Sequence, residues 1–114
     1  MTQLPTTELL RKAGADLDQI AVLHVAEAEL FADYRKAMQA ANRRAQKAIG
    51  DNMLVSWYDR DRDFESPQYK NESHTDSAFP RYIDYGLSHN ASLVVDIENG
   101  RFVFIYMKLD SMQV

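Results

Sequence analysis

Apolar side chains recur with a helical period between residues 34 and 49. At about 100° per residue, the apolar positions of this stretch fall within an arc of about 120°. Asp33 stands where an acidic side chain caps a helix, and Gly50 stands where a left-handed residue ends one. The pattern predicts an amphipathic helix whose small side chains let it pack closely on a sheet. Its apolar positions are Tyr34, Ala37, Met38, Ala41, Ala45, Ala48 and Ile49.

The residues before this helix favour a strand preceded by a short helix. Three of the six residues from Ile20 to Val25 are β-branched, which restricts their side chains and suits a pleated strand. Residues 6–14 have an apolar side and end at Gly14, so we expect a short helix there. Two alternatives stay open: one continuous helix over 17–49, and a frayed N-terminal tail.

Three further strand regions follow, and the last is a hairpin. The pattern predicts strands at 53–58 and 81–85, and a hairpin of 91–97 with 102–107. Asn99-Gly100 is a strong hairpin signal because both central residues of a type I′ turn need positive φ. Counting outward from the turn sets the register, which pairs Glu98 with Arg101, Ile97 with Phe102, Asp96 with Val103, Val95 with Phe104, Val94 with Ile105 and Leu93 with Tyr106.

This register makes the hairpin apolar on both faces. The face that carries Val95 and Phe104 suits the alanine side of the predicted helix. The opposite face is too apolar to meet water without cover. Either the N-terminal segment, the long loop after residue 58 or a second copy of the chain covers it, and we expect a homodimer. The residues of this second face are Val94, Val103, Ile105 and Met107, beside Asp96.

Together these elements predict an α+β fold of two layers. One long amphipathic helix packs on a mainly antiparallel sheet of four or five strands. The 114 residues match the usual size of a single domain, so we expect one domain over 1–114. Within it, residues 1–18 form an N-terminal extension with the short helix, and residues 19–108 form the α+β core.

Composition narrows the classes of function. Thirteen Lys and Arg against 17 Asp and Glu give a net charge of −4, and 46% of the residues are hydrophobic, as in ordinary globular proteins. The absence of cysteine excludes disulfides, thiolate metal sites and a cysteine nucleophile. With no secretory signal and no apolar run of about 20 residues, we expect a cytoplasmic protein that does not enter a membrane. The acidic balance argues against a dedicated nucleic-acid binder.

Positive charge is nevertheless concentrated on the predicted helix. No Asp or Glu occurs between residues 34 and 49, whereas five cations do. A solvated helix face is the plain interpretation. The alternative is a binding face for an acidic partner or nucleic acid, which requires these side chains to be exposed and uncovered. The cations are Arg35, Lys36, Arg43, Arg44 and Lys47.

The segment 59–80 shows no regular pattern, and loops of this length are often functional. Asp59, Asp61 and Asp63 alternate like the start of a calcium loop, but Phe64 stands where that loop needs glycine. His74 with nearby Ser and Asp residues lacks the Gly-x-Ser-x-Gly turn of a hydrolase nucleophile. We therefore expect an internally paired turn, with no metal ion and no cofactor.

An aromatic groove beside this loop is the main candidate for a ligand site. In that interpretation, large aromatic side chains frame a groove in which a small ligand stacks, and the charged loop forms its rim. In the plainer interpretation, Trp57 anchors the core and Asp59-Arg60 begins an ordered turn. The candidate site residues are Trp57, Tyr58, Asp59, Arg60, Asp61, Asp63, His74 and Tyr85, with Tyr82 also on the groove.

Several short motifs resemble a small prokaryotic domain family of unknown function. They are Trp57-Tyr58-Asp59 at a strand end, Ser66-Pro67 in the following loop, and a hairpin that ends in Phe102-Val103-Phe104. The resemblance covers about residues 30–107 and implies a helix, the strand and the C-terminal hairpin. Members of that family often carry a cysteine pair after Ser-Pro, where this chain has Tyr69-Lys70-Asn71-Glu72. The resemblance therefore implies a fold without a mechanism.

These observations favour a non-enzymatic binding or interaction module. The alternative is a small metal-dependent hydrolase or other enzyme that uses the acidic segment 59–76. Convergence of Asp59, Asp61, Asp63 and His74 on one pocket would favour the enzyme. Pairing of these carboxylates with arginines would count against it.

Overall fold

The computed structural model describes residues 5–26, 33–68 and 79–109. In this part of the chain, three helices surround a five-stranded mixed sheet of order β1-β4-β5-β2-β3, which confirms the α+β class. Strand β1 runs parallel to β4, and the other neighbouring pairs are antiparallel. The elements are α1 (Thr6–Lys12), β1 (Ala21–Val25), α2 (Tyr34–Ile49), β2 (Asn52–Asp59), the 3-10 turn η1 (Arg60–Arg62), β3 (Phe64–Ser66), α3 (Arg81–Ser88), β4 (Leu93–Ile97) and β5 (Phe102–Lys108).

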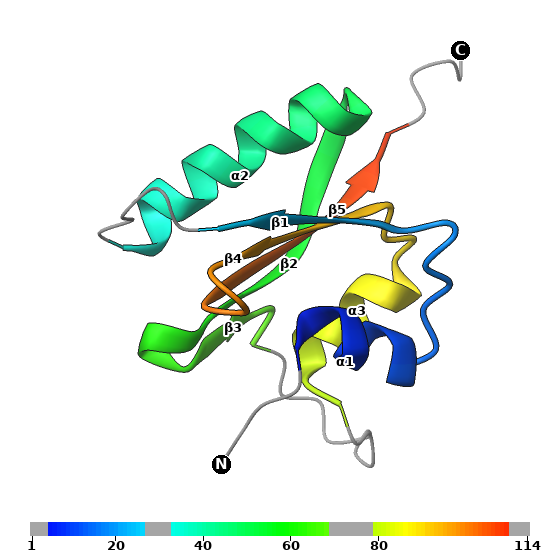
Figure 1. Cartoon of the computed structure of the whole chain (residues 1–114), viewed down its shortest axis with the longest axis horizontal. Helices are drawn as coiled ribbons and strands as arrows, with labels where there is room; N and C mark the ends of the chain where they lie inside the picture. Colours follow the sequence, from blue (N-terminus) through cyan, green and yellow to red (C-terminus); the bar gives the residue numbers. More distant parts are fainter. Residues whose placement is uncertain (1–4, 27–32, 69–78, 110–114) are drawn as a thin grey trace.

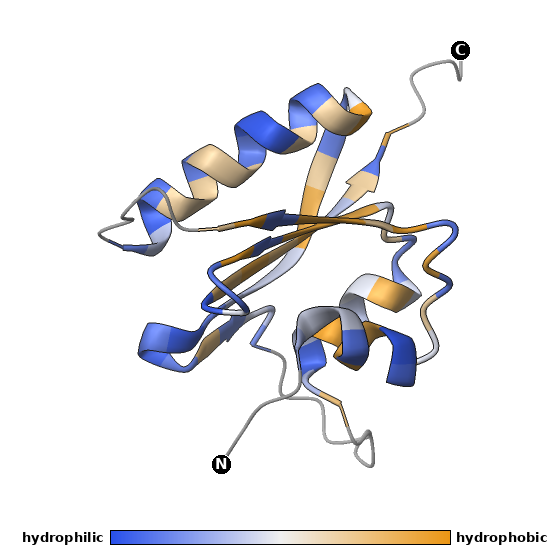
Figure 2. Ribbon diagram, in the orientation of Figure 1, coloured by the Kyte–Doolittle hydropathy of each residue, from blue (hydrophilic) through white to orange (hydrophobic). Residues whose placement is uncertain are grey.

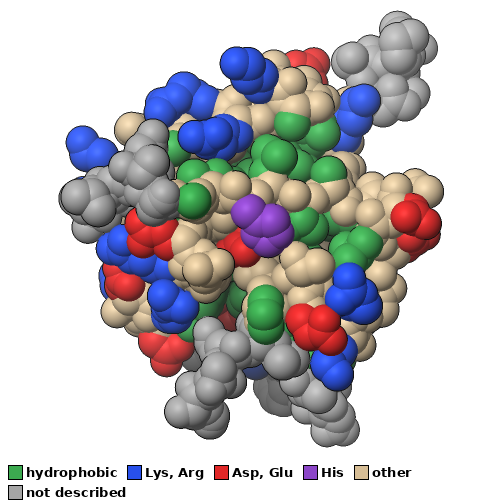
Figure 3. All heavy atoms as spheres, viewed as in Figure 1, with side chains coloured by type: hydrophobic (Ala, Val, Ile, Leu, Met, Phe, Trp, Pro, Cys, Tyr) green, Lys and Arg blue, Asp and Glu red, His purple; other side chains and the backbone are tan. Residues whose placement is uncertain are grey.

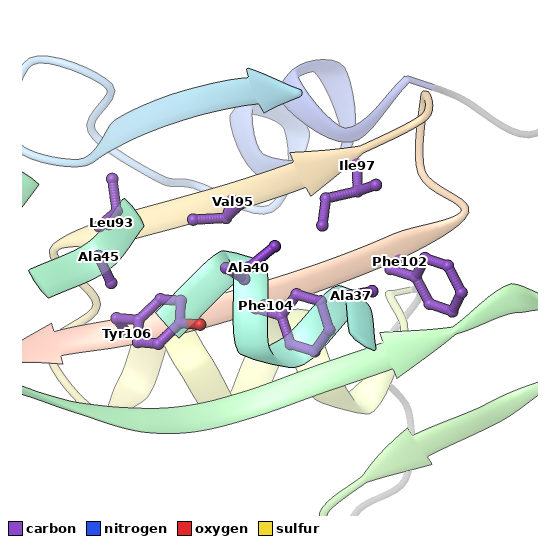
Figure 4. Packing of buried hydrophobic residues seen from close by; sticks show 10 residues of the cluster. Ala37, Ala40, Ala45, Leu93, Val95, Ile97, Phe102, Phe104 and Tyr106 are labelled. Atoms are coloured by element: carbon purple, nitrogen blue, oxygen red, sulfur yellow. The ribbon is translucent and has the colours of Figure 1, made fainter. Parts of the chain in front are cut away.

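Helix α2 covers one face of the sheet, as its alanine pattern predicts. It starts at Asp33, whose side chain accepts hydrogen bonds from the N–H groups of Arg35 and Lys36. The core beneath it joins small helix side chains to large strand side chains (Figure 4). Ala40 is buried there, whereas Ala48, which the helical wheel placed on the same side, is exposed. The buried set is Ala37, Ala40, Ala41, Ala45, Leu93, Val95, Ile97, Phe102, Phe104 and Tyr106.

The C-terminal hairpin has the predicted register. Strands β4 and β5 pair Ile97 with Phe102 at the turn, and every predicted pair of the two strands recurs. Asn99 and Gly100 have φ values of 52° and 86°. These are the left-handed conformations that the turn requires, and glycine adopts them without steric cost. The turn sequence alone was therefore sufficient to place both strands.

Residues 81–85 form the start of α3, so the strand predicted there is wrong. Pro80 precedes the helix, and Tyr82, Ile83 and Gly86 bury one side of it against the sheet. A Cβ at Gly86 would lie 2.8 Å from Cγ2 of Ile105, so glycine permits this close approach. In a run of only eight residues, aromatic and β-branched side chains resemble a strand, although their burial follows a helical spacing.

The second face of the hairpin is buried inside the same chain. Helices α1 and α3 cover it, so the structure has three layers rather than the predicted two (Figure 1). Val94, Val103 and Ile105 are fully buried against Leu10 and neighbouring side chains, and Met107 is partly buried. Leu10 of α1 and Ile83 of α3 belong to this second core, and Figure 2 shows hydrophobic residues on both helices and along the strands. The homodimer surface that we expected on these strand residues is therefore not free for a second copy.

Two other expectations concern residues 21–25 and the segment that follows β2. Residues 21–25 form the edge strand β1, as their β-branched content predicts. The segment 59–80 was expected to be irregular, but its start folds into η1 and β3, which pairs with the end of β2. None of the helices in the described part of the chain has the length and apolar content that a membrane crossing requires.

Candidate functional site

The aromatic residues of the expected groove lie on both faces of the sheet. Trp57 stacks on Tyr34 of α2 at 5.2 Å between ring centroids, on the α2 side. Tyr58 stacks on Tyr82 of α3 at 5.0 Å, on the opposite side. Tyr85 stacks on His89 at 3.9 Å. Neighbouring residues of a strand point to opposite faces, so Trp57 and Tyr58 do not frame one groove.

The carboxylates of the expected site pair with arginines. Asp59 is 2% exposed, and its Oδ2 accepts a hydrogen bond from Nε of Arg62 at 2.7 Å. Asp61 Oδ2 lies 2.7 Å from Nη2 of Arg101. The Arg101 hydrogen bond holds the pKa of Asp61 below its ordinary value, so Asp61 is a charged partner and not a proton donor. This is the internally paired turn that the sequence favoured.

The remaining candidates do not converge with them. Asp63 has a φ of 50° and closes η1, with its N–H donating to the carbonyl of Arg60. Arg60 Nη1 lies 3.4 Å from the carbonyl oxygen of Asn99. His74 lies outside the described residues. Among the residues that the structure places, no group of three or more His, Asp or Glu side chains is arranged to hold a metal ion.

A different polar cluster lies where β1 and β4 end. The parallel register places His24 of β1 beside Asp96 of β4, with both side chains on the α1 side of the sheet. His24 Nδ1 is 3.0 Å from Asp96 Oδ2. Asp96 is 3% exposed, and its Oδ1 accepts the N–H of Gly100 at 2.7 Å. A buried carboxylate thus holds an imidazole whose side chain is 59% exposed.

The cluster continues on both sides of His24. Its Nε2 lies 3.3 Å from Oγ1 of Thr7 on α1. On its other side a hollow of about 340 Å³ opens between the end of β1 and the hairpin turn. No Lys or Arg occurs among the described residues that line it. They are His24, Val25, Ala26, Asp96, Glu98 and Asn99.

The sequence interpretation did not join these residues. It gave neither His24 nor Asp96 a side-chain partner, whereas the structure pairs the two. The available signal was Asp96 itself, the only acidic residue of an otherwise apolar strand. A buried carboxylate requires a partner. That partner is 72 positions away, and the parallel pairing of β1 with β4 carries no local turn signal.

A second hollow lies on helix α2. It has a volume of about 530 Å³ and is lined by Ala40, Arg43, Arg44, Gln46 and Lys47. Basic side chains gather along this helix at the top of the view in Figure 3. The cations Arg43, Arg44 and Lys47 are exposed, and none forms an ion pair with a described residue. We call these five lining residues the basic face of α2.

Comparison with known proteins gives a fold and a family. The chain is similar to a solved structure described as a novel protein, AF1514, from Archeoglobus fulgidus DSM 4304, with 19% identity and a TM-score of 0.62. The match covers 80% of this chain and 96% of that one, and at this identity it shows the fold alone. No curated protein matches the chain. A family model described as "Domain of unknown function (DUF5619)" matches residues 20–106, and the chain belongs to this family.

Proposed function

We propose that the protein is a small binding module, and that a small anionic molecule binds at the basic face of α2. The observation that carries this proposal is the hollow of about 530 Å³ surrounded by Arg43, Arg44 and Lys47. The hollow is open and its described lining lies on α2 alone, so charge rather than enclosure would hold a ligand there. Three cations around one hollow attract phosphate or carboxylate groups.

The charge around this hollow is not neutralised by its own helix. Helix α2 contains no Asp or Glu. The protein as a whole carries −4, so the positive charge is confined to one region of an acidic molecule. This distribution favours a compact anion over a long polyanion, because a nucleic acid would extend beyond the helix and meet the net negative charge of the chain.

The enzymatic alternative on the segment 59–76 has weaker support. Asp59 and Asp61, which it requires as catalytic or metal-binding groups, are engaged by Arg62 and Arg101. A metal ion or substrate would have to displace a charge-assisted hydrogen bond at each of them. We therefore keep the binding module as the proposed function.

Thermal unfolding at low salt tests the proposal with inorganic phosphate, citrate and ATP as separate probes. A ligand that binds only the folded state raises the melting temperature. We expect at least one probe to raise it, and we expect the double variant R43E/K47E to weaken that binding by at least about tenfold, which is about 1.4 kcal/mol.

The matched control reverses charge elsewhere. Lys12 is an exposed cation in the last turn of α1, and K12E should leave the response unchanged. A gel shift with single-stranded and duplex oligonucleotides forms the second arm. The proposal is wrong if no small anion raises the melting temperature, or if oligonucleotides bind while the small anions do not.

A further inference from the structure

We infer that Tyr34, Trp57, Phe64 and Asp59 form a binding cage for the guanidinium group of a second molecule, and that Arg62 occupies this cage in the free chain. We call these four residues the Arg62 cage. None of them belongs to the basic face of α2, so the inference does not depend on the proposed anion site. The two sites also take ligands of opposite charge.

The walls of the Arg62 cage are three aromatic rings in contact with one another. Trp57 of β2 stacks on Tyr34 of α2, and its ring centroid lies 5.2 Å from that of Phe64 in β3. Phe64 pairs with Asp59 across the two strands, and side chains alternate along a strand, so Trp57, Asp59 and Phe64 share the α2 face of the sheet. Three separate elements thus present aromatic rings beside one buried carboxylate.

The position of Arg62 shows which chemical group fits between these walls. Its guanidinium carbon lies 4.0 Å from the ring centroid of Tyr34 and 4.8 Å from that of Phe64. Its Nε donates a hydrogen bond to Oδ2 of Asp59 at 2.7 Å. A planar guanidinium stacks on aromatic rings and pairs with a carboxylate at the same time, whereas an ammonium group is a compact, strongly hydrated charge. The arrangement therefore favours a guanidinium over an ammonium group.

Arg62 uses only one oxygen of the Asp59 carboxylate. Asp59 is 2% exposed, and its second oxygen, Oδ1, is buried and accepts no hydrogen bond from a described residue. A buried acceptor without a donor is costly. A guanidinium that approaches with two parallel N–H groups satisfies both oxygens of a carboxylate. Arg62 lies three residues from Asp59 and approaches through Nε, whereas the guanidinium of a second molecule is free of that restriction.

Arg62 can leave the cage when another guanidinium enters. Its side chain is 46% exposed and belongs to the short 3-10 turn η1. Without any cation, Asp59 would stay buried and unpaired, so the departure of Arg62 alone is unfavourable. A second guanidinium restores both the ion pair and the ring contacts. Arg62 is thus an internal competitor, which reduces the apparent affinity for the ligand in proportion to the fraction of chains whose cage is open.

Fluorescence titration of the full chain tests the inference, because Trp57 is its only tryptophan and lies in the cage wall. The probes are methylguanidinium, as a small molecule, and the peptide acetyl-Gly-Arg-Gly amide, as a model of a protein segment. We expect both the unaltered chain and R62A to respond, with R62A binding at least about tenfold more tightly, as for a cage that is open in about one-tenth of the chains or fewer. R62K keeps the charge but cannot form the same stack, so its affinity should lie between the two.

Matched variants separate the cage from the rest of the turn. Arg60 lies in the same turn but contacts the carbonyl of Asn99, so R60A should bind like the unaltered chain. R62A/D59N removes the carboxylate and should lose the response. Circular dichroism establishes folding, and R62K carries the test if R62A does not fold.

The two probes also distinguish the sources of the guanidinium. Binding of the peptide supports a protein segment as the ligand, and binding of methylguanidinium alone supports a small guanidine compound. The inference is overturned if neither probe changes the emission of Trp57 in the folded variants. It is also overturned if acetyl-Gly-Lys-Gly amide binds as tightly as the arginine peptide, or if R60A gains as much affinity as R62A.

Discussion

Arg101 joins the two turns at one end of the sheet. Its guanidinium lies 2.7 Å from Asp61 in η1 and 2.8 Å from Glu98 in the hairpin turn. Its main-chain carbonyl also accepts the N–H of Arg60 at 2.8 Å. Through this residue the segment after β2 is attached to the hairpin, which explains why the start of the predicted loop is ordered.

We expect the contribution of Asp61 to stability to depend on pH. Its pKa is lowered from 3.8 in the folded chain, chiefly by the hydrogen bond from Arg101. Its contribution is therefore complete above that ordinary value and is lost as pH falls through the lowered one. D61N should destabilise the protein by about 0.2–1 kcal/mol at neutral pH, as for other exposed ion pairs. Urea unfolding should show this difference shrinking below about pH 4.

Asp63 provides the matched control for this measurement. It lies two residues further on, forms no ion pair with a described residue, and has a φ of 50° that asparagine also tolerates. D63N should cause a smaller loss at neutral pH. An equal loss in both variants would show that the Arg101 pair does not stabilise the turn.

For single residues, the sequence predicted the ion pairs of the charged turn correctly, but it did not predict the geometry of the expected aromatic site. The three aspartates of the charged turn were expected to pair internally, and Asp59 and Asp61 do so. The groove failed because Trp57 and Tyr58 are neighbours in a strand and face opposite ways. Strand alternation was already in the sequence and was sufficient to exclude that groove. The His24–Asp96 pair, in contrast, depends on which distant strand lies beside β1.

Among the elements, α3 depends on the absence of a side chain at Gly86. The helix packs against β2 and β5, where Ser56 Oγ donates to the carbonyl of Tyr82 at 2.8 Å. A Cβ at Gly86 would lie 2.8 Å from Cγ2 and 3.0 Å from Cδ1 of Ile105. Since a β-branched side chain in a strand has little rotational freedom, the helix would have to move away.

G86A should therefore lower the free energy of unfolding. Overpacking costs about 1–3 kcal/mol and alanine contributes up to about 1 kcal/mol to a helix, so we expect a net loss of up to about 2 kcal/mol. Chemical denaturation measures it. The double variant G86A/I105A removes the clashing carbon atoms, so the two substitutions should cost less together than the sum of their separate effects. Strict additivity would contradict the contact.

The elements also show where sequence patterns were sufficient. Helix α2 and the hairpin were predicted with their ends nearly correct, because capping residues and turn residues mark them locally. Residues 81–85 were assigned to a strand because a short apolar run fits both periods, and packing on the sheet decided the outcome. Helix α3 also covers Val94, Val103 and Ile105. The apolar strand face that led us to expect a homodimer is therefore already buried.

In the whole molecule, the N-terminal helix closes the second core. Leu10 of α1 is fully buried with Ile83, Val94 and Ile105, whereas Leu9 beside it is only half-buried. L10A should cost about 2–4 kcal/mol, because it removes buried methyl groups and leaves a cavity. L9A makes the same chemical change in the same helix and should cost clearly less. Comparable losses would show that α1 is not part of the core.

Removal of residues 1–15 tests whether α1 is needed to cover the apolar face of the hairpin. The intact chain has its apolar hairpin face covered by α1 and α3, so light scattering should give the mass of one chain, 13.1 kDa. Without α1 part of that face meets water, and exposed apolar surface drives association or loss of the folded state. We expect the shortened chain to show a higher mass or a lost unfolding transition. A shortened chain that kept the single-chain mass and an unchanged melting temperature would mean that α3 alone is sufficient to cover the sheet.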